Sequence, residues 1–170
     1  LTLARLCYTT LLEDGTKAMD AARERKATPA FERIVEANTL LSGLGFESSG
    51  LAAAHSIHNG LTVAPQTRAF FHGEKVAFGA LVQLVLENSP SSEIEEVLAF
   101  CTAVGLPVTL AQIGLHDLPG EMLEKIALRA VREGESIHNE PLAVDSSRVM
   151  DAILAADQLG KSWKESRRQL

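Results

Sequence analysis

The chain has 170 residues, of which 46% are hydrophobic and 22% charged, a composition typical of a globular domain in water. Its net charge of −6 argues against a surface for nucleic acids or anionic membranes. No segment is long and apolar enough to suggest a membrane span, and we expect no signal peptide. The two cysteines, Cys7 and Cys101, make no disulfide framework and suit a reducing compartment, so we expect a cytoplasmic protein.

The first third of the chain has apolar residues at helical spacing. A first run begins near Leu3, and Asp14-Gly15 is expected to dent or end it. Thr28-Pro29 is a typical helix start, with a capping hydroxyl followed by proline at the first helical position. The face predicted for this second helix, which runs on to Gly43, consists of Phe31, Ile34, Val35, Asn38 and Leu41.

Helical patterns also fill the remainder. A helix is predicted to start near Ser49, and the segment 74–87 is apolar almost all round, which is typical of a helix buried on every side. Further helices are predicted for the ranges 91–105, 119–134 and 149–159, the last capped at 145–147. The basic tail, KSWKESRRQL, is more typical of a solvated helix end or a disordered terminus than of a nucleic-acid patch. With no strand-like alternation, the class is all-α, with about seven to nine helices in a single domain over residues 1–170.

Three of the five histidines lie between residues 51 and 75. His55 and His58 are three residues apart, which places both on one face of a helix. Asn59-Gly60 is expected to end that helix, and His72 opens the next helical run. Two imidazoles from the two helices could therefore meet at one metal ion. Taken alone, two histidines are weak evidence, and polar groups satisfied at helix ends are the more common explanation.

The stretches GLGFESSGLAAAHSIHNG and FFHGEKVAFG resemble, in residue type and spacing, the glycerol dehydrogenases, members of the metal-dependent alcohol dehydrogenases often called iron-containing. The resemblance runs from VEANTLLSGLGFESSG through GESIHNEP to ADQLG near the end. It corresponds to the C-terminal half of such an enzyme. Because the first residue is leucine, we expect a processed or truncated product. The resemblance implies a compact multi-helix domain like the C-terminal domain of iron-type alcohol dehydrogenases.

By this resemblance, His55 and His72 match the two histidine ligands of a catalytic metal, zinc or iron. The family completes its site with an aspartate that lies upstream of this segment. Asp14 and Asp20 do not lie in the matching motif. Because a catalytic zinc normally has three protein ligands, the two histidines are expected to bind it weakly or not at all.

Three other positions are given a role, and two of them, Phe46 and His138, also match the family. Phe46 is expected to line the substrate pocket, although a core phenylalanine is the ordinary interpretation. His58 is expected to face the substrate or nicotinamide pocket, and a hydrogen bond at a helix end is an equally good interpretation. A structural role is expected for His138. We assign no catalytic residue within this chain.

No cofactor-binding residue is assigned either. The segment GLGFES, residues 43–48, is a near miss to the dinucleotide fingerprint, but a helix rather than a strand precedes it. In the family, the NAD-binding domain lies N-terminal to everything in this segment.

Two functions from different classes follow from the resemblance. The complete enzyme oxidises glycerol or a similar polyol with NAD and a divalent metal, and this chain alone is expected to be inactive. Alternatively, the chain is a non-catalytic helical scaffold or oligomerisation module. The face that would meet the cofactor domain should leave apolar area exposed, so a homo-oligomer is expected, with neither nucleic acid nor membrane as a partner.

Overall fold

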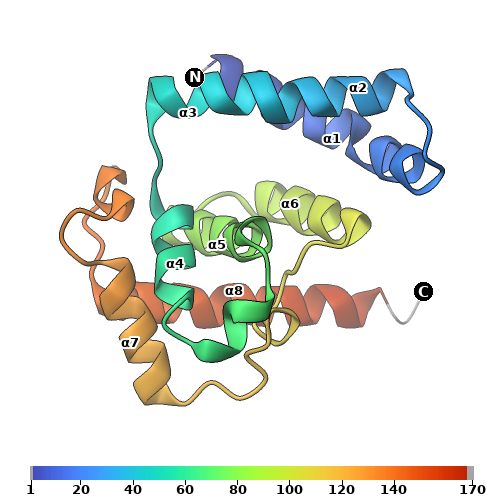
Figure 1. Cartoon of the computed structure of the whole chain (residues 1–170). Helices are drawn as coiled ribbons and strands as arrows, with labels where there is room; N and C mark the ends of the chain where they lie inside the picture. The colour runs from blue at the N-terminus through green and yellow to red at the C-terminus, as the bar shows by residue number, and fades with distance from the viewer. Residues whose placement is uncertain (1, 168–170) are drawn as a thin grey trace. The chain divides into compact units, whose positions relative to one another are not determined.

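Figure 1 presents the computed structural model of the chain, in which residues 2–167 are described. All regular elements in this range are helical, and no strand occurs there, which confirms the all-α prediction. The chain forms two compact units, one ending at Gly50 and the other beginning at Leu51. The organisation of the whole chain as one domain stays a prediction.

The first unit contains α1 (Thr2–Arg23), α2 (Pro29–Glu36), a π-helical turn (Ala37–Leu41) and α3 (Ser42–Ser49). The predicted cap is confirmed, because the Thr28 hydroxyl accepts a hydrogen bond from the Phe31 N–H at 3.3 Å. The prediction that Asp14-Gly15 interrupts α1 is wrong. Asp14 is buried and accepts two hydrogen bonds from Arg33 of α2, at 2.6 and 3.0 Å, which hold α1 and α2 together.

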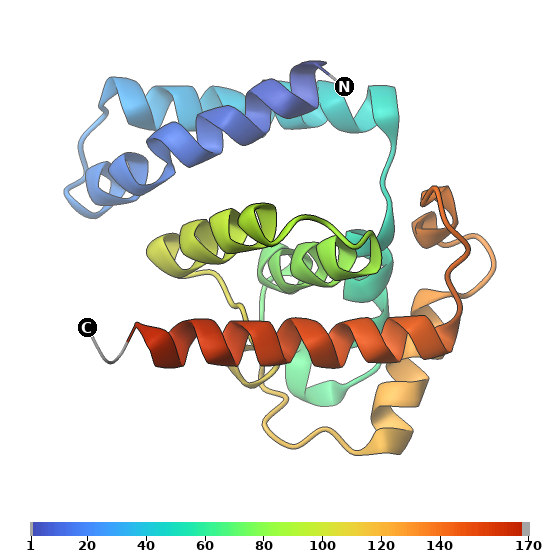
Figure 2. The same ribbon diagram turned by 180° about the vertical axis from the view of Figure 1, so that it is seen from behind.

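The second unit contains five α-helices, which are α4 (Ala53–Leu61), α5 (His72–Leu86), α6 (Ser91–Val104), α7 (Gly120–Ala130) and α8 (Ser146–Ser166). Short 3₁₀ turns lie between them at Pro65–Ala69, Ala111–Ile113 and Ser136–Asn139. Figure 2 gives the reverse view, with α8 in red as the longest helix of this unit. Helix α5 contacts α4, α6 and α8. Its side chains Phe78, Leu81 and Val82 are buried, as the apolar pattern predicted.

The boundaries of α4 differ from the predicted ones. The helix begins at Ala53 rather than near Ser49, because Ser49 is the last residue of α3 and the φ of +76° at Gly50 breaks the helix. Asn59-Gly60 does not end α4, which continues to Leu61. A Cβ at Gly60 would lie 2.5 Å from the carbonyl oxygen of Ile126. Gly60 therefore allows α4 and α7 to approach closely. It lies inside α4 and does not end the helix.

The C-terminal helix is longer than the pattern predicted. The cap is confirmed, because the Asp145 carboxylate accepts a hydrogen bond from the Arg148 N–H at 2.9 Å. Helix α8 then continues through Trp163 to Ser166, so most of the basic tail is helical. Residues 168–170 of the tail lie outside the described range.

Candidate functional site

The three histidines of the central segment come together in the second unit. His55 and His58 lie on α4, and His72 is the first residue of α5. The ring centre of His72 lies 5.4 Å from that of His55 and 4.2 Å from that of His58. His72 Nδ1 is 3.1 Å from His58 Nε2, a hydrogen-bonding distance. Helix capping and the intervening turn therefore produce the juxtaposition that the spacing predicted.

The electrostatic environment of His55 and His58 favours their neutral imidazoles. Burial lowers the pKa of His55 below its usual value, and the neighbouring His72 lowers it further. Burial also lowers the pKa of His58, and the hydrogen bond that His58 donates to Asn59 Oδ1 opposes this effect. The neutral form carries the lone pair that a metal ion needs, so the donor chemistry of the cluster suits a metal.

The ligand set is nevertheless incomplete. Among residues 2–167, no group of three or more histidine, cysteine, aspartate or glutamate side chains is arranged to hold a metal ion. Two imidazoles fit part of a zinc site, and at least one further protein ligand would have to come from elsewhere.

A polar chain continues from the histidines into the loop after α7. His58 Nδ1 is 3.1 Å from Asn59 Oδ1, and Asn59 Nδ2 donates to Glu135 Oε2 at 2.8 Å. Glu135 also forms an ion pair with Arg129 of α7. Burial opposes the ionisation of Glu135, but donors from Arg129 and Asn59 lower its pKa overall. Glu135 and Arg129 are far from the histidines in sequence, and no local pattern pointed to them.

The start of α4 is capped by side chains from distant segments. Glu140 Oε1 accepts a hydrogen bond from the Ala53 N–H at 2.8 Å, and Gln83 Oε1 accepts one from the Ala54 N–H at 3.0 Å. Since the first N–H groups of a helix have no partner within it, these acceptors replace a local cap. They fix the end of the helix that carries His55.

A buried lysine supports the segment before His72. Lys75 is 7% exposed and donates to the carbonyl oxygens of Thr67 and Phe70, at 3.2 and 3.0 Å. It ties the 3₁₀ turn to α5. The sequence offered one indication of this role, because Lys75 is a charged residue in the otherwise apolar segment 74–87.

The other predicted positions belong to elements other than α4 and α5. Phe46 is in α3 of the first unit and is 53% exposed, so it is not a core residue, and its substrate role stays a prediction. GLGFES is helical and follows the π turn, without a strand before it. His138 Nε2 lies 3.1 Å from the Val131 carbonyl oxygen, at the end of α7.

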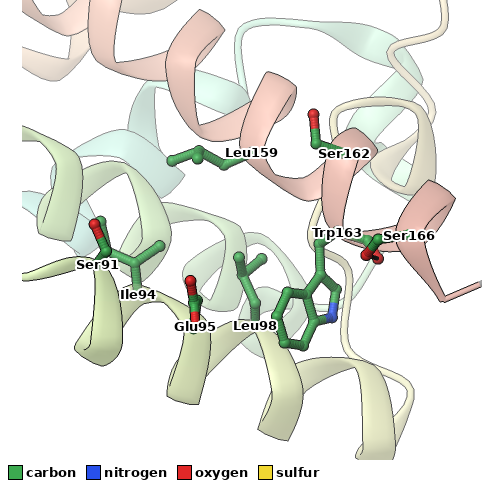
Figure 3. A pocket seen from close by; sticks show the side chains of 8 residues that line it. All are labelled: Ser91, Ile94, Glu95, Leu98, Leu159, Ser162, Trp163 and Ser166. Carbon is green, nitrogen blue, oxygen red and sulfur yellow. Dashed lines mark hydrogen bonds between the residues drawn. The ribbon is translucent and has the colours of Figure 1, made fainter.

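A pocket with a volume of about 400 Å³ lies between α6 and α8, and Figure 3 shows the side chains that line it. Ile94 and Leu98 face Leu159 and Trp163 across it. Within the described range, Trp163 Nε1 is a buried donor without a hydrogen-bond partner. The pocket contains no histidine or cysteine, and its mainly apolar lining also includes three serines and Glu95.

Comparisons with known proteins connect the chain to a class of enzyme. No family model matches the chain. It is 57% identical over 166 residues to a glycerol dehydrogenase of Pseudomonas putida, covering 97% of this chain and 45% of the relative. A crystal structure of glycerol dehydrogenase from Schizosaccharomyces pombe matches with a TM-score of 0.95 and 40% identity, over 99% of this chain and 43% of that one. A probable glycerol dehydrogenase from Sinorhizobium meliloti matches with a TM-score of 0.92 and 47% identity, over 95% of this chain and 45% of that one.

These findings identify the fold as that of a helical part of a dehydrogenase. More particularly, the chain is a homologue of glycerol dehydrogenases over a C-terminal part of their length. It spans less than half the length of the relatives that it matches. No helix among the described residues is long and apolar enough to cross a membrane.

Proposed function

We propose that the chain supplies the metal- and substrate-binding half of a glycerol dehydrogenase. The observation that carries this proposal is the meeting of His55, His58 and His72 at the junction of α4 and α5. Two of them are the residues to which the resemblance assigns the metal. The activity of the chain by itself is not part of the proposal.

In the complete enzyme, a bound divalent metal such as zinc would polarise a hydroxyl of glycerol or a similar polyol, and NAD would accept the hydride. His55 and His72 would hold the metal through neutral imidazoles, and the residue that completes the ligand set would be an aspartate outside this chain. His58 contacts His72 directly and so borders the same site. Phe46 would shape the substrate pocket.

The alternative, a non-catalytic helical scaffold, has an observation of its own in its favour. His72 and His58 are hydrogen-bonded to each other, so these two imidazoles are satisfied without a metal. A scaffold would keep the core around α5 and bind no zinc.

We also infer a cytoplasmic homo-oligomer. Two free thiols, Cys7 and the buried Cys101, suit a reducing compartment. Large apolar side chains are exposed in the second unit, including Phe71 at 81%, Leu128 at 53% and Leu154 at 50%. Exposed apolar surface promotes association. Sedimentation at micromolar concentration checks this, and a monomer would contradict it.

Zinc binding tests the metal role. The chain and its His55→Ala and His72→Ala variants are equilibrated with zinc, and the bound metal is measured together with the helix content. If the two histidines hold zinc without the third ligand, the wild type should show weak but saturable zinc binding that is strongly reduced in both variants. His116→Ala is the control, because His116 is an exposed histidine outside the cluster.

Equal zinc binding by the wild type and both cluster variants would contradict the metal role. Absence of binding in all of them would favour the scaffold. Mixing the chain with a separately produced N-terminal half of a relative and assaying glycerol oxidation then tests the complete function.

A further inference from the structure

Four side chains form a continuous hydrogen-bonded path that ends at His72. Glu135, in the loop after α7, accepts from Asn59 Nδ2 at 2.8 Å. Asn59 Oδ1 lies 3.1 Å from His58 Nδ1, and His58 Nε2 lies 3.1 Å from His72 Nδ1. The path joins residues that are far apart in the sequence, and the proposed function assigns no role to Glu135 or Asn59.

The chemistry of Glu135 gives the path a single direction. An ionised carboxylate can only accept hydrogen bonds, and the ion pair with Arg129 keeps Glu135 ionised. The NH₂ group of Asn59 must therefore face Glu135, which turns its carbonyl oxygen toward His58. That oxygen can only accept, so His58 must carry its proton on Nδ1.

The same reasoning continues to the next ring. A neutral His58 with its proton on Nδ1 has an unprotonated Nε2, which accepts a hydrogen bond. His72 must then donate from Nδ1. In neutral His72 this leaves Nε2 as the nitrogen with a free lone pair.

We propose that Glu135, acting through Asn59 and His58, fixes the tautomer and the orientation of His72, so that its Nε2 is the nitrogen available to a metal. Glu135, Asn59 and His58 are positioning residues in this arrangement. The metal part rests on the proposed function. The tautomer part concerns the metal-free chain and stands independently of it.

Histidine ligands in metal sites are commonly held by hydrogen bonds of this kind. A histidine ligand usually donates its other ring N–H to a neighbouring acceptor, and loss of that acceptor typically costs 10–100-fold in metal affinity. Here the acceptor is a second histidine, whose own tautomer has to be set by something else. The Asn59–Glu135 pair supplies that constraint.

The decisive experiment is nitrogen NMR of the metal-free chain with ¹⁵N-labelled histidine rings, at a pH where the rings are neutral. We expect both His58 and His72 to carry the proton on Nδ1. A proton on Nε2 of His72 would overturn the proposal. Since this measurement uses the wild-type chain without zinc, its result does not depend on whether the chain binds a metal.

Two variants test whether Glu135 sets the donor-to-acceptor direction of the hydrogen-bonded path. In Glu135→Gln the terminal group can donate as well as accept, so Asn59 is free to turn, and we expect mixed tautomers at both rings and zinc affinity lower by about 10–100-fold. The double variant Asn59→Asp/Glu135→Gln exchanges amide and carboxylate along the path. A carboxylate at position 59 again accepts from His58, so we expect the single tautomer and the zinc affinity to return.

Unchanged tautomers and unchanged zinc affinity in Glu135→Gln would overturn the role of Glu135. Loss of metal binding in every form, with the expected tautomers in the wild type, would overturn the proposed metal function and leave the tautomer control intact. Circular dichroism of each variant separates these results from unfolding.

Discussion

Gly79 of α5 packs directly against the backbone of Ala54 of α4, so that a side chain at position 79 would clash with the Ala54 carbonyl oxygen. Ala54 immediately precedes His55, and His72 is the first residue of α5. The distance between the two helices that carry the histidines therefore depends on this glycine. Gly79→Ala should force α4 and α5 apart.

We expect Gly79→Ala to lower the free energy of unfolding by about 1–3 kcal/mol, the usual cost of overpacking, and to weaken zinc binding. Denaturant unfolding measures the first effect. Gly73→Ala is the matched control on the same helix, because a Cβ there has no neighbour within 4 Å. A smaller effect of Gly79→Ala than of Gly73→Ala would contradict the close packing.

The buried carboxylate of Asp14 should control the stability of the first unit. The hydrogen bond from Arg33 lowers the pKa of Asp14 below its usual value of 3.8, against the effect of burial. The folded state therefore holds the ionised form more strongly than the unfolded state does. The stabilisation is complete well above pH 3.8 and is lost as the pH falls through the lowered pKa.

Asp14→Asn removes this ionic interaction at neutral pH, so amide exchange in α1 and α2 should become faster. If the two units open independently, α4 to α8 should be unaffected. The control is Asp20→Asn, because the Asp20–Arg23 pair is exposed on both sides and such pairs contribute little. If both variants accelerate amide exchange equally, the burial of Asp14 does not determine its contribution to stability.

Glu140, which caps α4, should make the second unit more stable at mildly acidic pH. Burial raises its pKa above the usual 4.5, the Ala53 N–H acts in the opposite direction, and the neighbouring Glu87 raises it further. The folded state thus binds a proton more readily than the unfolded state. The stability from this group is present below pH 4.5 and is lost as the pH rises through the raised pKa.

Glu140→Gln keeps an oxygen for the Ala53 N–H and removes the charge. We expect it to flatten the pH dependence of unfolding above pH 4.5 and to raise stability at neutral pH by less than about 1 kcal/mol. Glu140→Leu removes the acceptor and should cost about 0.5–2 kcal/mol, like other lost caps. Thermal unfolding from pH 4 to 8 distinguishes them, and equal destabilisation by both variants would exclude repulsion from Glu87.

The sequence predicted the structure correctly where a feature depends on residues close to one another in the chain. Thr28 and Asp145 cap helices through residues three positions away, and the apolar character of 74–87 predicted a buried helix. The placement of His55 and His72 near one another followed from two helices and a short connection. Helix propensity and periodicity act over such distances, which is why these predictions were confirmed.

The features that the sequence did not predict depend on contacts between distant segments. The pairing of Asn59 with Glu135 and the capping of Ala53 by Glu140 cannot be read from spacing. Gly60 illustrates the same limit. A glycine after asparagine is a normal stop signal, but here its value lies in the close approach of α7, which only the tertiary structure determines.

The π-helical turn at Ala37–Leu41 has a consequence for Phe46. The Ser42 N–H bonds to the Ala37 carbonyl, one residue further back than in an α-helix, so the turn contains one additional residue. Each residue of an α-helix rotates the chain by about 100°, so all side chains after the turn are rotated by that angle relative to the stripe that begins at Phe31. Deleting one residue in this turn would restore a regular α-helical register and would point Phe46 in a different direction. The additional residue in the π turn, several positions before Phe46, thus determines the direction in which this aromatic side chain points.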